Sequence, residues 1–129
     1  MSRKAPVRLT ATNVETGAVV ASRVRIASKR LERAIGLLTT RAFTPGEGLL
    51  ITPCRGVHTC GMRFAIDVIA IDEDGLVVDA VPALRPWRIR LPRPRGFNVL
   101  ELPEGMLKKT RTRVGHHISL KLAPAWEGK

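Results

Sequence analysis

Two apolar runs joined by a short acidic turn constrain the fold of this chain more than any other feature. Residues 65–71 and 76–81 flank the turn Asp72-Glu73-Asp74-Gly75. An Asp-Gly pair between apolar runs is typical of a β-hairpin, because glycine readily adopts the positive φ that such a turn requires. The pattern therefore predicts two antiparallel strands in the middle of the chain.

Short strand-like runs recur along the rest of the chain. Residues 7–11 and 18–26 predict a second hairpin, and further strands are expected at 49–51, 97–102 and 118–122. Apolar residues at helical spacing predict one short helix near residues 29–38. The prolines of residues 82–96 lack amide donors, which excludes a central strand and favours an extended arm or an edge strand. We therefore expect a mostly β (α+β) fold: a compact barrel-like sheet of about seven short strands with one short helix.

Length and hydropathy indicate the general class of protein. A chain of 129 residues fits a single domain, 1–129, and we expect flexible ends at residues 1–5 and 124–129. No apolar run approaches the roughly 18 residues that cross a bilayer, and the start lacks the apolar stretch of a secretion signal. We expect a cytoplasmic protein without a membrane partner. A reducing compartment disfavours a disulfide between Cys54 and Cys60. The oligomeric state is left open.

The formal net charge of +11 is concentrated in the second part of the chain. Five arginines and no acid lie between residues 81 and 100, and a second basic cluster occupies residues 108–113. We name residues 85–95 the arginine-rich arm; its candidate anion-binding residues are Arg85, Arg88, Arg90, Arg93 and Arg95. Such a stretch is typical either of a solvated edge strand that resists aggregation or of a surface that binds nucleic acid or an acidic protein. With only 4% aromatic residues, the chain offers few rings for stacking on bases.

Side chains that can carry chemistry gather in residues 53–62. Cys54, His58, Thr59, Cys60 and Met62 lie there, and Asp67 follows at the start of an apolar run. One interpretation is structural: His58 and Asp67 pair through a hydrogen bond, and Met62 fills a gap in the core. The other is a small-ligand pocket lined by His58, Thr59, Met62 and Asp67, with Arg33 or Glu101 nearby.

Two further interpretations have weaker support. Cys54, His58 and Cys60 resemble part of a zinc site, but its fourth ligand would come from His116 or His117, and adjacent residues on a strand point to opposite faces. A Cys54 nucleophile with His58 as base lacks a nucleophile elbow and an oxyanion loop. No phosphate-binding glycine loop occurs. We therefore expect no catalytic residue, no metal and no cofactor.

Several motifs together resemble a known family. They are ArgAlaIleGlyLeuLeu at 33–38, Gly48-Leu49-Leu50, ProCysArgGlyValHisThr at 53–59, Met62 with IleAspVal at 66–68, Asp72 through Gly75, and ValLeuGluLeuPro at 99–103 with Gly105. Over residues 24–122 the chain is similar to the bacterial and archaeal domain of unknown function 192, an uncharacterised ancient conserved region. The resemblance implies a compact, barrel-like β domain with one short helix and no established activity.

The resemblance also marks individual positions. The motif positions are Arg33, Gly36, His58, Met62, Asp67, Glu101 and Gly105. The chain departs from the family pattern at Cys60, where an aromatic residue is commoner, and at His116, where an Asp is commoner.

The sequence thus favours a non-enzymatic β domain, although it leaves catalysis open. The predicted site binds a small polar or anionic ligand and is centred on His58, Met62 and Asp67. The alternative is a protein that binds nucleic acid or another polyanion through the arginine-rich arm and residues 108–113. Because the arm and the His58 segment lie apart in sequence, we treat them as separate features.

Overall fold

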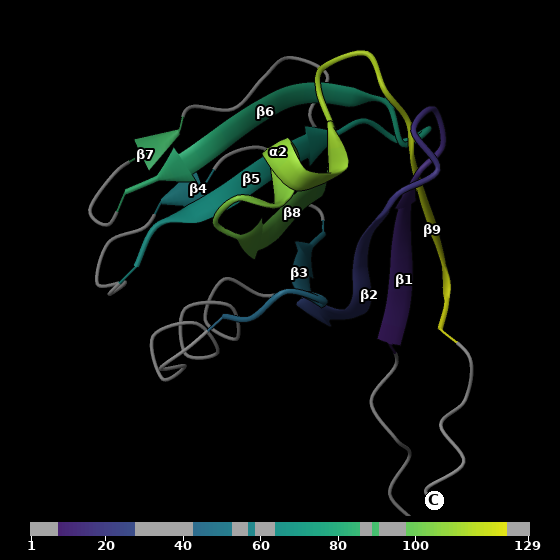
Figure 1. Cartoon of the computed structure of the whole chain (residues 1–129), viewed down its shortest axis with the longest axis horizontal. Coiled ribbons are helices and arrows are strands. Elements are labelled where there is room, and N and C mark those ends of the chain that lie inside the picture. The colour runs from purple at the N-terminus through teal and green to yellow at the C-terminus, as the bar shows by residue number, and fades with distance from the viewer. Residues whose placement is uncertain are drawn as a thin grey trace, which may run out of the picture.

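One seven-stranded sheet forms the framework of the molecule (Figure 1). The computed structural model describes residues 8–27, 43–52, 57–58, 64–85, 89–90 and 98–123. The strands of the sheet are β1 (Arg8–Asn13), β2 (Val19–Ala27), β3 (Glu47–Ile51), β5 (Ile66–Ile71), β6 (Val77–Leu84), β8 (Asn98–Pro103) and β9 (Ile118–Leu122). Their order is β6-β5-β8-β3-β2-β1-β9, and only β2 and β3 run parallel to each other. A two-stranded sheet pairs β4 (Val57–His58) with β7 (Ile89–Arg90), and the helix α2 (Met106–Thr110) follows β8.

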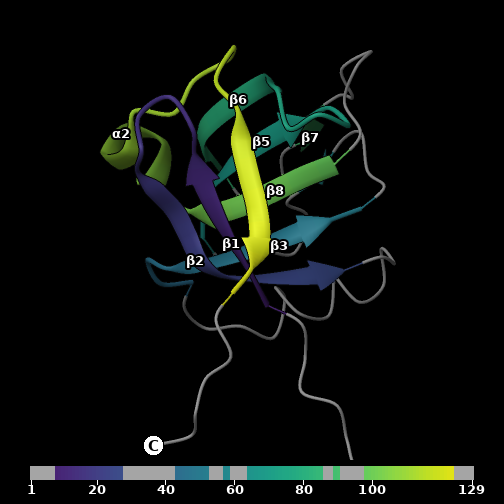
Figure 2. The ribbon, with the colours of Figure 1, turned by 90° about the vertical axis from the view of Figure 1, so that its right-hand side faces the viewer.

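Bulges curl the main sheet into a half-barrel (Figure 2). In β2, Ser22 and Arg23 together lie opposite Thr10 of β1, and the register shifts again near Val20. The β5–β6 pair is also interrupted at two points along its length. Each bulge places an extra residue on one strand and increases the local twist, which bends a sheet towards closure.

Backbone hydrogen bonds close one end of this half-barrel. The turn between β5 and β6 meets the start of β9, where Val77 N–H donates to the His116 carbonyl and Ile118 N–H donates to the Gly75 carbonyl, both at 2.8 Å. Gly115 N–H donates to the Val77 carbonyl at 3.0 Å. We call this end the closed end. The opposite end, where β1 begins and β9 ends, is the open end.

Apolar side chains are buried on both faces of the sheet. The inner face is filled from all seven strands and from α2 by Ala11, Val20, Ala21, Val24, Leu50, Ile69, Ile71, Val77, Leu100, Leu102, Met106, Leu107 and Ile118. An outer cluster covers β3, β5 and β8 and contains Leu49, Ile51, Ile66, Val68 and Val99. Burial on both faces explains why apolar residues occupy successive positions in these three strands, interrupted in β5 and β8 by the buried carboxylates of Asp67 and Glu101.

Most predicted strands are confirmed. Both hairpins form, and β3, β8 and β9 fall at or within a residue or two of the expected ranges. The strand β6 continues through Pro82 to Leu84, at the edge of the sheet, as the prediction of an edge strand allowed. Pro82 lies at a bulge, where its missing N–H group does not remove a hydrogen bond between strands.

The described residues do not test the predicted helix, and they contain a second one. The helix expected near residues 29–38 lies outside the described residues, whereas the described helix α2 was not predicted. Among the described helices, none is long and apolar enough to cross a bilayer.

We expect Gly75→Ala to destabilise the fold strongly. Gly75 has φ +86°, and an added Cβ would lie 2.5 Å from the carbonyl oxygen of Ile118 at the closed end. Strain at positive φ and this clash should together cost about 3 kcal/mol. The matched control is Gly17→Ala, where φ is +74° but no atom lies within 4 Å of the new Cβ, so about 1 kcal/mol is expected. Urea unfolding would measure both; equal losses would contradict the close contact at Gly75.

Candidate functional site

Asp67 is a buried carboxylate that joins three elements of the fold. The residue lies in β5 with no exposed surface. Its Oδ1 accepts a hydrogen bond from Ala83 N–H in β6, and its Oδ2 accepts one from Leu107 N–H in α2, both at 2.8 Å. Because each carboxylate oxygen already receives a backbone donor, Asp67 acts as a positioning residue.

The contact with Ala83 stabilises an irregular point in β6. Pro82 and Ala83 form a two-residue bulge opposite Asp67, and Ala83 has φ 49°, a conformation that costs energy for a residue with a Cβ. A charge-assisted hydrogen bond from the Ala83 N–H offsets this cost. Asp67 therefore helps to set the direction in which the chain leaves β6 towards the arginine-rich arm.

Glu101, the second carboxylate predicted near the pocket, lies on the other face of the sheet. It is 1% exposed and sits in β8 between its cross-strand partners Leu49 and Val68, which belong to the outer cluster. Asp67 is paired with Leu102, a residue of the inner core. Since successive side chains of a strand alternate between faces, the structure does not bring the two carboxylates together.

The His58 segment and the arginine-rich arm are hydrogen-bonded neighbours. Val57 of β4 is paired with Arg90 of β7, and His58 is paired with Ile89 in the same antiparallel register. This two-stranded sheet lies near the end of the β5–β6 hairpin that contains Ile66 and Leu84 (Figure 1). The sequence analysis treated the arm and the His58 segment as separate features. That prediction is wrong, because the backbones of the two segments pair at β4 and β7.

Of the remaining predicted site residues, the structure describes only some. Arg85 is exposed just after the end of β6. Arg33, Thr59, Met62, Arg88, Arg93 and Arg95 lie outside the described residues, as do Cys54 and Cys60. Their roles stay predictions.

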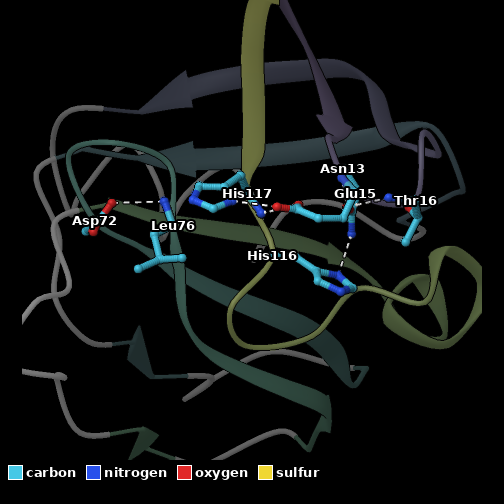
Figure 3. Close-up of polar contacts among 7 residues, drawn as sticks. All are labelled: Asn13, Glu15, Thr16, Asp72, Leu76, His116 and His117. Atoms are coloured by element: carbon cyan, nitrogen blue, oxygen red, sulfur yellow. Dashed lines mark hydrogen bonds and ion pairs between the residues drawn. The ribbon is translucent and has the colours of Figure 1, made fainter.

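Sequence analysis missed a polar cluster at the closed end, centred on Asn13 (Figure 3). Asn13 is fully buried, and its Oδ1 accepts hydrogen bonds from the N–H groups of Glu15 and Thr16 at 3.0 and 3.1 Å. Its Nδ2 contacts Thr112 Oγ1 and His116 Nδ1, each at 3.0 Å. An Asn just before a turn containing Thr16 and Gly17 is a signal for such side-chain bonding, but it does not reveal the distant partners.

The donors in this cluster can be assigned. The two backbone donors identify Oδ1 of Asn13 as the acceptor, so the Asn13 Nδ2 is the donor. His116 Nδ1 therefore accepts a hydrogen bond from Nδ2, and a neutral His116 carries its proton on Nε2. Thr110 donates its hydroxyl hydrogen to the Met106 carbonyl, so Thr112 donates in the 2.7 Å contact between the two threonines.

His117 forms a separate exposed contact with Glu15. Its Nδ1 lies 2.6 Å from Glu15 Oε2, and its N–H donates to Oε1 at 2.7 Å. Hydrogen bonds from the His117 side chain, and then from its backbone, lower the pKa of Glu15 from 4.5 to about 2. His116 and His117 thus contact different partners, and within the described ranges no three His, Cys, Asp or Glu residues form a metal-binding group.

Comparisons with known proteins agree on the family and on the fold. The model of domain of unknown function 192 (DUF192), described as an uncharacterised ancient conserved region, matches residues 11–120. The UPF0127 protein of Pyrococcus abyssi is 35% identical over 102 residues, covering 74% of this chain and 84% of that relative.

Two solved structures are similar in fold. A protein of unknown function from Novosphingobium aromaticivorans has a TM-score of 0.73 and 19% identity, covering 88% of this chain and 84% of its own. A protein from Sinorhizobium meliloti with a proposed role as a transcription regulator has a TM-score of 0.76 and 21% identity, with coverage of 93% and 97%. At these identities the likeness shows the fold alone.

We expect Asp67→Ala to cost about 3 kcal/mol in urea unfolding, because two backbone donors lose a charged acceptor. Asp67→Asn keeps one acceptor oxygen and should cost about half as much. The matched control Asp74→Asn changes an exposed turn residue and should stay within about 0.5 kcal/mol of the parent. If Asp67→Ala were as mild as the control, Asp67 would not have a positioning role.

The pKa of Glu15 predicts a specific loss of stability in acid. Because folding lowers this pKa from 4.5 to about 2, the Glu15–His117 contact stabilises the fold above pH 4.5, and its contribution is lost as the pH falls through 2. Urea midpoints measured from about pH 6 to about pH 2 should therefore fall less steeply for Glu15→Gln than for the parent chain. The control Glu104→Gln alters an exposed carboxylate elsewhere and should follow the parent. Coincident profiles for the parent and Glu15→Gln would contradict the assignment.

Proposed function

We propose that this chain, which belongs to the DUF192 family, is a binding domain that holds a small anionic ligand where β4 meets β7. The observation that carries the proposal is the pairing of Val57 with Arg90 and of His58 with Ile89. This pairing joins the segment richest in chemically active side chains to the segment richest in arginine.

The charge of the arm favours an anion over a neutral polar ligand. Residues 81–100 contain five arginines and no acid. A guanidinium presents a planar set of donors that matches a carboxylate or phosphate, and an imidazole N–H can add a further donor. The ligand class that fits is therefore a small carboxylate or phosphate compound.

The geometry of Asp67 supports a positioning role in the same neighbourhood. Both oxygens of its buried carboxylate accept backbone hydrogen bonds, one of them from Ala83, two residues before Arg85. Asp67 thus stabilises the bulge from which the chain continues towards the arm. We assign the ligand contacts to His58 and Arg90, with Thr59, Met62 and Arg33 as further candidates from the sequence. Glu101 faces away from Asp67 and is not included.

The proposal contains no catalytic step. The Pyrococcus relative carries a name without an activity. A binding role needs only positioned donors.

Thermal unfolding and calorimetry with inorganic phosphate, citrate and a nucleoside monophosphate would test the proposal. For a Kd near 1 mM, about 10 mM of the matching anion should stabilise the parent chain by about 1.4 kcal/mol. Arg90→Gln and His58→Gln should each weaken binding about tenfold, since each removes one of the proposed donors.

Arg113→Gln is the matched control, because it removes the same charge from an exposed site near the closed end. It should bind as the parent does. The proposal fails if no anion stabilises the parent, or if Arg113→Gln weakens binding as much as Arg90→Gln.

A further inference from the structure

The outer face of β9, β1 and β2 carries a cluster of cations that sequence analysis did not single out. Arg8 of β1 lies directly opposite Arg25 of β2, and Lys121 of β9 lies directly opposite Thr10 of β1. The alternating residues Leu9 and Ala11 point into the core, so Arg8, Thr10 and their cross-strand partners point outwards. With Arg23 of β2, we call these residues the basic face.

We propose that the basic face binds the phosphate backbone of double-stranded nucleic acid. The three strands contain four cations and no acidic residue. Figure 2 views the molecule from this side, with β9 and β1 nearest the viewer. The surface is distinct from β7, which belongs to the two-stranded sheet, and from the lysines of α2.

The pairing of Arg8 with Arg25 indicates an external anion. Like charges directly opposite each other on neighbouring strands destabilise a sheet. Neither arginine forms an ion pair in the part of the chain that the structure describes. Glu47 of β3 is the register partner of Arg23, not of Arg25, and its carboxylate accepts hydrogen bonds from Thr44. A phosphate bound between the two guanidinium groups would relieve the repulsion.

Acidic side chains limit the contact to one end of this face. Glu15 lies in the turn between β1 and β2, and Asp72, Glu73 and Asp74 lie in the turn between β5 and β6, both at the closed end. Arg8, Arg25 and Lys121 lie towards the open end. A polyanion is therefore attracted to the open-end half and repelled from the other.

The composition of the face fits nucleic acid better than protein. Protein interfaces need an apolar or aromatic centre, whereas nucleic-acid interfaces are polar and positively charged. Thr10, Thr12 and Ser119 add hydroxyl groups of the kind that contact phosphate oxygens. The exposed apolar residue Val19 lies beside Thr12, at the closed-end margin of the face.

The absence of aromatic residues from β1, β2 and β9 favours a duplex over a single strand. Proteins that bind single strands stack bases on aromatic rings, whereas a duplex can be held through its phosphates alone. Three adjacent strands span about 10 Å, comparable with the roughly 12 Å width of the DNA major groove. Binding through phosphates also predicts little dependence on base sequence.

Fluorescence anisotropy with a labelled mixed-sequence duplex of about 20 base pairs would test the proposal over a series of salt concentrations. Each phosphate contact adds about 0.9 to the slope of log affinity against log salt, so Arg8→Gln/Arg25→Gln should reduce that slope by about 2. The fall in affinity between about 50 and 200 mM salt should then be about 12-fold smaller than for the parent. Lys121→Gln, an independent variant of the same face, should reduce the slope by about 1.

Lys108→Gln/Lys109→Gln removes the same charge from exposed positions of α2 and should leave the slope within about half a unit of the parent. Circular dichroism and urea unfolding would verify the fold of each variant. The proposal is overturned if the parent does not bind duplex at low salt, or if both double variants change the slope equally. Tighter binding of the matching single strand, or equal competition by polyglutamate, would also overturn it.

Discussion

The backbone seam at the closed end is the interaction on which the rest of the structure depends. Three N–H···O bonds join the β5–β6 turn to the start of β9, which are elements from opposite edges of the sheet. Because this seam closes one end of the curled sheet, side chains from all seven strands surround a single inner core. The same contact brings Asn13 within reach of Thr112 and His116, and Glu15 within reach of His117. The polar clusters of the closed end are therefore consequences of the curl.

The curl also divides the outer face of the sheet into two chemically different halves. Over β3, β5 and β8 this face carries buried apolar side chains, together with the buried carboxylate of Glu101. Over β9, β1 and β2 it carries arginine, lysine and hydroxyl side chains. The anionic ligand proposed at β4 and β7 and the duplex proposed on the basic face would thus occupy separate parts of one positively charged protein. The net charge of +11 is therefore distributed over more than one candidate binding surface.

The positions of strands could be predicted from the sequence wherever neighbouring residues alone indicate an extended segment or a turn. The Asp-Gly turn specified the β5–β6 hairpin, and the short motifs identified the family that the family model and the Pyrococcus relative confirm. The helix α2 was missed because its five residues are too few to show helical spacing, and its lysines read as part of a charge cluster. The two-residue strands β4 and β7 were missed because they pair across about 30 residues of sequence, and no local pattern records such a partner.

By itself, the sequence determined which residues are apolar, where the chain turns and which segments extend, because these properties depend on neighbours within a few positions. Tertiary structure alone decided which polar groups meet. Asp67 and Glu101 are separated by alternation across a sheet whose order could not be read from the chain, whereas His58 and the arginine-rich arm are joined by a distant pairing. The physical reason is that strand pairing acts through backbone hydrogen bonds, which every residue except proline can form on both its N–H and its C=O. Partners in a sheet are therefore selected by the packing of the whole molecule, and the candidate sites follow from that selection.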